Sequence, residues 1–191
     1  MTWYELLLLL HIVAVIVWLG SGLFIQILAT RAERANDAEG LRRVAADSAA
    51  LSEKLFIPAS LATLIFGVLL VIEGPWTFDT LWIVLGLVGY LGTFLTGVLV
   101  MKPGSEKLAA LMEREGMSAQ AEIEIRKLLT KARVDTIVLY LVVAVMALKP
   151  TGDDVGILVA LAAIVVVGLG YVALRLRQID ESAVHSAPAA T

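Results

Sequence analysis

The chain has 191 residues, a formal net charge of −3 and an apolar fraction of 59%, against about 45–50% in ordinary soluble proteins. So apolar a composition leaves too little polar surface to cover a soluble core, and it also excludes a disordered chain. The negative charge argues against nucleic-acid binding, and the absence of cysteine excludes disulfides, thiolate metal sites and covalently attached haem.

The first apolar run, residues 6–28, is long enough to cross a membrane as a helix, which takes about 20 residues. No basic residue precedes this run and no clear cleavage site follows it, so we expect a retained helix rather than a removed leader. It contains His11, the one histidine within an apolar run, and Trp18, which is predicted to lie near the middle of the membrane.

A basic connection follows, and its apolar residues recur near helical spacing. We therefore expect an amphipathic helix here, with Asn36 or Asp37 as its N-cap. This helix is predicted to continue without a break into the second apolar run, residues 55–72, where Pro58 is a local feature near the membrane entry.

The third apolar run covers residues 81–101. The sequence Lys-Pro-Gly around Pro103 predicts the end of this span, after which Ser105 caps a short separate helix that Gly116 stops.

The fourth apolar run, residues 134–148, is shorter than a span requires. The residues before it favour helix and lack Gly and Pro, so we expect one long helix that starts at Ser118 and ends with this run. The fifth run covers residues 156–174, and the composition of residues 179–191 predicts a disordered cytoplasmic tail.

The basic residues predict the orientation of these five spans. With five spans, 14 of the 15 Lys and Arg residues lie on one side of the membrane and only Lys149 lies on the other. By the positive-inside rule the N-terminus is outside and the C-terminus inside. At the inner boundary, Arg133 and Asp135 are expected to form an ion pair.

The predicted fold is therefore all-α. Residues 1–178 form a single transmembrane domain in a bacterial cytoplasmic (inner) membrane, in which spans one to four make an antiparallel four-helix bundle and span five is peripheral.

His11 is the strongest candidate for chemistry, because an ionisable residue inside a membrane is costly and imidazole is a common ligand of haem iron. A neutral histidine that hydrogen-bonds to a neighbouring helix is the alternative. Tyr90 and Tyr140 fall near the depth of His11 in their own spans, so either can share a hydrogen bond with it. The predicted site therefore has His11 as metal ligand, with Trp18, Tyr90 and Tyr140 lining a pocket for haem b.

Small residues lie roughly along one face of the third span, and they are Gly86, Gly89, Thr93 and Gly97. Such a face usually allows close packing of helices. The chain lacks the motifs of nucleotide hydrolases, serine hydrolases and zinc proteases. We therefore assign no catalytic residues and favour a protein without enzyme activity, a question that the sequence leaves open.

The stretch of residues 10–24, with His11, Trp18 and Gly20, resembles the first helix of a broad group of small bacterial membrane proteins. The group includes HemJ-type protoporphyrinogen oxidases, the CopD membrane domain and an uncharacterised family of predicted integral membrane proteins. The last is the most similar, through Pro103. The HemJ-type resemblance implies a b-type haem with His11 as an axial ligand. HemJ-type proteins also have an intramembrane arginine after the Gly-Leu-Phe of this helix and a further histidine in a later helix. This chain has neither.

These observations leave three functions open. The first is a membrane protein that binds haem b or a porphyrin through His11. The second is a non-catalytic accessory subunit that contacts a membrane-protein partner, or another copy of itself, through the glycine-rich third span. The third is a permease for a small solute or metal ion. All three have the lipid bilayer as surroundings, and none involves nucleic acid.

Overall fold

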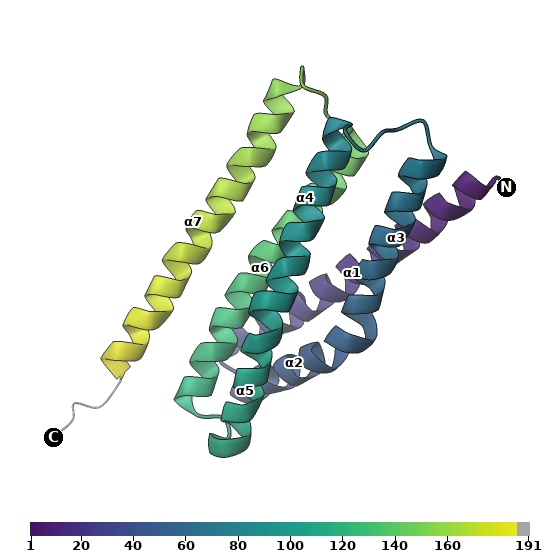
Figure 1. Ribbon diagram of the computed structural model, residues 1–191. Helices are drawn as coiled ribbons and strands as arrows, with labels where there is room; N and C mark the ends of the chain where they lie inside the picture. Colours follow the sequence, from purple (N-terminus) through teal and green to yellow (C-terminus); the bar gives the residue numbers. More distant parts are fainter. Residues whose placement is uncertain (187–191) are drawn as a thin grey trace.

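The computed structural model describes residues 1–186, and all regular secondary structure in that part of the chain is helical (Figure 1). In chain order the elements are α1 (Trp3–Arg34), α2 (Ala38–Leu51), the π-helical turn η1 (Ser52–Phe56), α3 (Ile57–Glu73), α4 (Leu81–Thr96), the π-helical turn η2 (Gly97–Met101), α5 (Lys102–Glu115), α6 (Ala119–Leu148) and α7 (Val155–Ser186). The prediction of an all-α fold is thus confirmed for the described residues.

Several helix ends are set by the residues that the sequence suggested. The Asp37 side chain accepts a hydrogen bond from the Gly40 amide at 2.8 Å and begins α2. The Ser118 hydroxyl accepts from the Ala121 amide at 3.2 Å and begins α6. Gly116 ends α5 with a φ of 67°, a conformation that favours glycine.

Two long helices run without a break, one through α2, η1 and α3 and the other through α4, η2 and α5. Each contains a π-helical turn just before a proline. The Ile57 amide bonds to the Ser52 carbonyl and the Lys102 amide bonds to the Gly97 carbonyl, so each wide hydrogen bond is donated by the residue before Pro58 or Pro103. Proline has no amide proton and its ring crowds the carbonyl four residues back, and the wider turn accommodates both effects.

The expected break at Pro103 is therefore wrong. Proline is tolerated in the first turn of a helix, and Lys102–Glu115 continues from η2 without a gap. Ser105 lies inside α5 and does not cap it.

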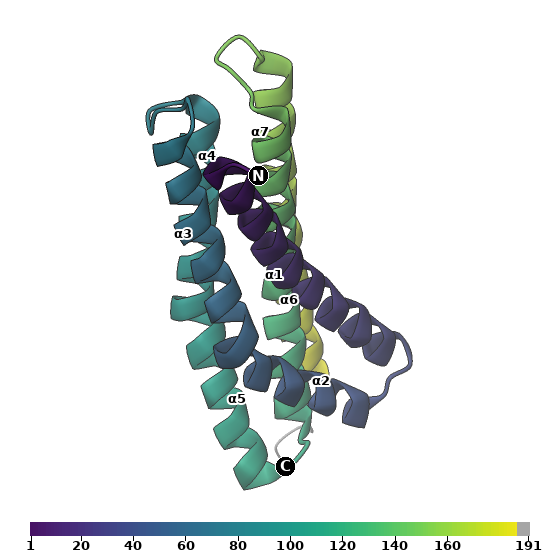
Figure 2. The same ribbon diagram turned by 90° about the vertical axis from the view of Figure 1, so that its right-hand side faces the viewer.

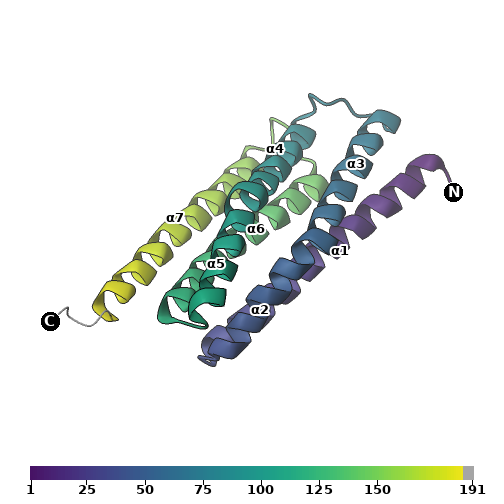
Figure 3. The same ribbon diagram turned by 60° about the horizontal axis from the view of Figure 1, so that its bottom comes forward.

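The long helices form two antiparallel pairs, α1 with α3 and α4 with α6, and α6 also contacts α1 and α7. α7 packs on α6 at the side of the bundle (Figures 1 and 2). α2, α5 and the C-terminal end of α7 lie at one end of the molecule, opposite the N-terminus and the α3–α4 loop (Figures 1 and 3). This arrangement brings the basic connections together at one end.

A cluster of buried apolar residues lies at this basic end, where α1, α2, α5 and α6 meet. Its buried members are Ile25, Ala29, Ala32, Leu41, Val44, Leu108, Ala121, Ile125 and Leu129. Burial of these side chains holds the amphipathic connections α2 and α5 against the ends of the long helices. The connections are therefore part of the packed fold.

Among the described residues, four helical segments are long and apolar enough to cross a membrane: Trp3–Arg34, Ala38–Glu73, Leu81–Glu115 and Val155–Glu181. α6 is not one of them, because its apolar end is too short and is flanked by charge. Lys131 and Arg133 lie just before this end, and Asp135 lies within it. Large apolar side chains on the outer faces are exposed, up to 71% for Val167. Such surfaces suit contact with lipid rather than water.

Ion pairs at the basic end differ from the expected one. Arg133 does not pair with Asp135; its guanidinium donates to the Glu33 carboxylate, which joins α6 to α1. Lys127 of α6 pairs with Asp180 of α7 at 2.7 Å, and this hydrogen bond raises the pKa of the Lys127 ammonium above its ordinary value. The short sequence separation of Arg133 and Asp135 suggested that pair, but the packing of α6 on α1 makes Glu33 the partner of Arg133.

The predicted tail, residues 179–191, overlaps the end of α7, which continues as helix through Ser186. Helix-forming residues follow Arg175, and Asp180 is held by an ion pair to α6. The remaining residues of the predicted tail, 187–191, lie outside the described part of the chain.

Close packing of α4 on α6 yields a testable prediction. A Cβ added at Gly89 would lie 2.5 Å from Val142 Cγ2, whereas one added at Gly92 would meet nothing within 4 Å. Because valine is stiff about χ1, Gly89→Ala should destabilise the α4–α6 pair by about 1–3 kcal/mol. Thermal unfolding in detergent should show this loss for Gly89→Ala and not for the control Gly92→Ala. Equal stability of the two variants would contradict the close packing.

Candidate functional site

The His11 imidazole lies between α1 and α3. Its Nδ1 atom is 2.9 Å from the backbone carbonyl oxygen of Thr63. A carbonyl oxygen only accepts hydrogen bonds, so Nδ1 carries the proton and donates it. In the neutral ring the Nε2 atom therefore keeps its lone pair, which is the form that binds a metal.

Gly67 allows this approach. A Cβ at Gly67 would lie 3.1 Å from His11 Cε1 and 3.4 Å from Nδ1, so the ring occupies the space that a side chain would fill. The Thr63 carbonyl also accepts the helical hydrogen bond from the Gly67 amide four residues later. The Thr63 hydroxyl donates to the Ala59 carbonyl at 2.9 Å, so it does not compete with His11 for the Thr63 carbonyl.

The structure brings two of the predicted site residues together. Trp18 of α1 and Tyr90 of α4 meet edge to face with ring centroids 5.7 Å apart, and Tyr90 stacks on Phe94 at 6.1 Å. Trp18 lies two helical turns, about 10 Å, along α1 from His11. The aromatic rings therefore form a layer beside the histidine, farther toward the basic end.

The Tyr90 hydroxyl is buried and makes no hydrogen bond of ordinary geometry to a described residue. The Ser60 hydroxyl of α3 is the polar group on that side, and it donates to the Ile57 carbonyl at 3.0 Å. The Ser60 oxygen can still accept, so it is the polar partner that α3 offers to the Tyr90 hydroxyl.

Tyr140 is placed differently from Tyr90. Its side chain is 43% exposed on α6, so it does not share the enclosed layer of Trp18 and Tyr90. Neither tyrosine takes the role of hydrogen-bond partner to His11 that their depth suggested, because the Thr63 carbonyl does. Thr63 and Gly67 are absent from the predicted site; their spacing of four, which puts a small residue and a polar one on the same face of α3, was the available signal.

The small residues of α4 serve internal packing. A Cβ at Gly86 would meet Met146 Cε at 2.1 Å, and one at Gly89 would meet Val142. Both positions therefore face α6. A Cβ added at Gly92 of α4 or at Gly97 of η2 would have no heavy atom within 4 Å, so these two positions do not pack against another helix.

Within the described residues, no three His, Cys, Asp or Glu side chains come close enough together to hold a metal ion. His185, the second histidine, lies outside the residues whose side chains are described. A ligand at His11 would accordingly have to bring most of its own donor atoms.

A comparison with protein families identifies the chain. The family described as "Predicted integral membrane protein (DUF2269)" matches residues 5–150, which is most of the chain and includes every residue of α2 to α6. The chain belongs to this family. The match confirms the resemblance to predicted integral membrane proteins.

The DUF2269 match covers the candidate site but not the last helix. It includes His11, Thr63, Gly67 and the aromatic layer, whereas α7 lies beyond it. No curated protein and no solved structure matches the chain. The more distant similarity to HemJ-type oxidases and to the CopD domain stays a prediction.

Proposed function

We propose that this protein crosses a bacterial cytoplasmic membrane five times, with its N-terminus outside and its C-terminus inside. The gathering of 14 of the 15 Lys and Arg residues toward the end of the bundle that holds α2 and α5 supports this orientation. α6, which has 30 residues and contacts α1, α4 and α7, is long enough to be the remaining span. Its charged first half would lie at the inner surface.

The cysteine-free chain makes this topology directly testable. Ala119 is the first residue of α6 and Gly152 follows its last residue, and both positions are exposed, so a single cysteine can be placed at either one. A membrane-impermeant maleimide applied from the outside should label Gly152→Cys at once and Ala119→Cys only after permeabilisation. If both positions react from the same side, α6 does not cross the membrane and the five-span topology is wrong.

We propose further that the protein binds a b-type haem through His11 Nε2. The observation that carries this proposal is the hydrogen bond from Nδ1 to the Thr63 carbonyl. Histidines that ligate metals commonly donate their other ring proton to a backbone carbonyl, which fixes the tautomer and makes the ligating nitrogen more basic. The donor set fits haem, because a porphyrin supplies four donors and needs a single imidazole.

The residues around His11 would fix and enclose the ligand. The Thr63 carbonyl and the bare backbone at Gly67 hold the imidazole plane, and Trp18 and Tyr90 supply apolar ring surface about two turns away. A bound haem would supply one-electron or ligand-binding chemistry at its iron. The resemblance to HemJ-type proteins, which is itself a prediction, implies the same cofactor, a b-type haem.

An absorption spectrum tests the haem proposal. Protein purified in detergent from haem-replete cells should show a Soret band, and His11→Ala should lose it while still eluting as a single species. His185→Ala is the matched control, because it removes the other histidine, and it should keep the band. Colourless wild-type protein, or a Soret band that survives in a well-folded His11→Ala variant, would refute haem binding at this residue.

A further inference from the structure

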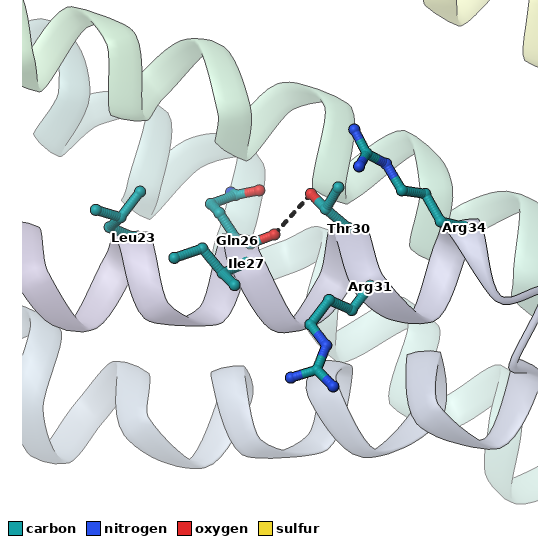
Figure 4. A pocket seen from close by; sticks show the side chains of 6 residues that line it. All are labelled: Leu23, Gln26, Ile27, Thr30, Arg31 and Arg34. Carbon is teal, nitrogen blue, oxygen red and sulfur yellow. Dashed lines mark hydrogen bonds between the residues drawn. The ribbon is translucent and has the colours of Figure 1, made fainter.

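A shallow hollow lies on one face of α1 near its basic end, away from His11 (Figure 4). Its volume is about 320 Å³, and it is lined by Leu23, Gln26, Ile27, Thr30, Arg31 and Arg34. These positions follow one another at intervals of three and one residues, which places them on a single stripe of the helix. The helix itself therefore presents this set of side chains together.

The hollow is polar and basic at one end. Figure 4 shows the guanidinium groups of Arg31 and Arg34 extending to opposite sides of it. Within the described residues neither guanidinium has an ion-pair partner, although nearby Glu33 pairs with Arg133 of α6. Two arginines thus flank the hollow with no carboxylate to neutralise them.

The lining changes character along the helix axis. Leu23 and Ile27 lie on the membrane side, about 6–12 Å from Arg31 at 1.5 Å per residue. Gln26 lies between Leu23 and Ile27 along the helix, and Thr30 lies between Ile27 and Arg31. The Thr30 hydroxyl donates to the Gln26 backbone carbonyl at 2.8 Å, while the Gln26 side-chain oxygen is buried and unpartnered within the described residues.

We propose that this hollow holds one anionic phospholipid, with its phosphate between Arg31 and Arg34 and an acyl chain over Ile27 and Leu23. Along α1 the apolar residues Leu23 and Ile27 precede Thr30 and the two arginines, and this order matches the order acyl chain, ester, phosphate in a lipid. A free phosphate would use only the two arginines and would leave the apolar half uncovered. Guanidinium groups bind phosphate oxygens well, and basic pockets at the inner membrane surface select anionic lipids. The proposal requires that α1 crosses the membrane, but it does not depend on haem at His11.

Native mass spectrometry of lipids retained by the detergent-purified full chain tests the proposal. From an equal mixture of phosphatidylglycerol and phosphatidylcholine, the wild type should retain phosphatidylglycerol at least about fivefold more. The double variant Arg31→Gln/Arg34→Gln should lose this preference, and Arg31→Lys/Arg34→Lys should retain part of it, because the charge remains.

The matched control is Arg42→Gln/Arg43→Gln on α2. It removes the same charge from the same end of the molecule, but these arginines already pair with Glu39 and Asp37. The control should keep the wild-type preference. Equal loss in both double variants would show a diffuse effect of basic charge, and unchanged preference in the Arg31/Arg34 glutamine variant would place the lipid elsewhere; either result overturns the proposal. Displacement of phosphatidylglycerol by millimolar inorganic phosphate would also overturn it, since the hollow would then be a site for a free anion.

Discussion

Replacing Glu33 with glutamine is expected to destabilise the bundle by about 2–4 kcal/mol, the largest loss of stability that we predict for a single charged residue. The Glu33 carboxylate accepts a hydrogen bond from Arg133, and the two side chains are only 17% and 20% exposed. A neutral residue at position 33 would leave the Arg133 guanidinium partly buried without a counter-charge. The cost arises mainly from that unpaired charge, because the desolvation of Arg133 is no longer compensated.

Thermal unfolding in detergent measures this effect. Glu39→Gln is a suitable control, since Glu39 pairs with Arg42 within one exposed helix and its removal should lower the unfolding temperature far less. The exchange Glu33→Arg with Arg133→Glu restores opposite charges across α1 and α6 and should recover part of the loss. If Glu33→Gln is no less stable than Glu39→Gln, the pair does not hold these helices together.

Much of the fold could be predicted because its signals are local in sequence. The long apolar runs predict helices of membrane-spanning length, and Asp37, Gly116 and Ser118 mark helix ends through their own side chain or backbone preference. A long helix ending with residues 134–148 followed from the absence of Gly and Pro before that run, and α6 confirms it. These features need no knowledge of neighbouring helices.

Features that depend on two distant segments could not be predicted in the same way. Arg133 has Asp135 two residues away in sequence, but side chains two apart on a helix do not face each other, and Glu33 on α1 takes the role. Pro103 predicts the end of a helix, and this prediction is wrong. The amino-acid sequence alone does not reveal that a π-helical turn precedes the proline. Both errors come from applying a local rule where the surrounding helix geometry decides.

The candidate site shows the same division. The polar character of His11 within an apolar run identified it from sequence, and its depth brought Tyr90 and Tyr140 forward as partners. Its actual partner is a backbone carbonyl, which every residue possesses and which therefore leaves no mark in a sequence. Depth along a helix gives no information about rotation about its axis, so the exposure of Tyr140 could not be foreseen.

Replacing Gly67 with valine should displace the His11 ring and abolish its hydrogen bond to Thr63. An added Cβ would already lie 3.1 Å from His11 Cε1, and the two γ-methyl groups of valine need further space in the same direction. We expect a loss of stability of about 1–3 kcal/mol from overpacking. Haem binding at His11, as proposed, should weaken together with the loss of ring orientation.

The tautomer of His11 provides a readout that does not depend on haem. In ¹⁵N-histidine-labelled, haem-free protein, wild-type His11 should show a protonated Nδ1 and an unprotonated Nε2, and Gly67→Val should lose this fixed pattern. The chain has only two histidines, so His185→Ala assigns the spectrum. Gly92→Val is the matched control, since it places the same side chain in a helix where nothing lies within 4 Å. A Gly67→Val protein with the stability of Gly92→Val and an unchanged His11 spectrum would show that Gly67 does not position the ring, and the geometric support for haem at His11 would then be lost.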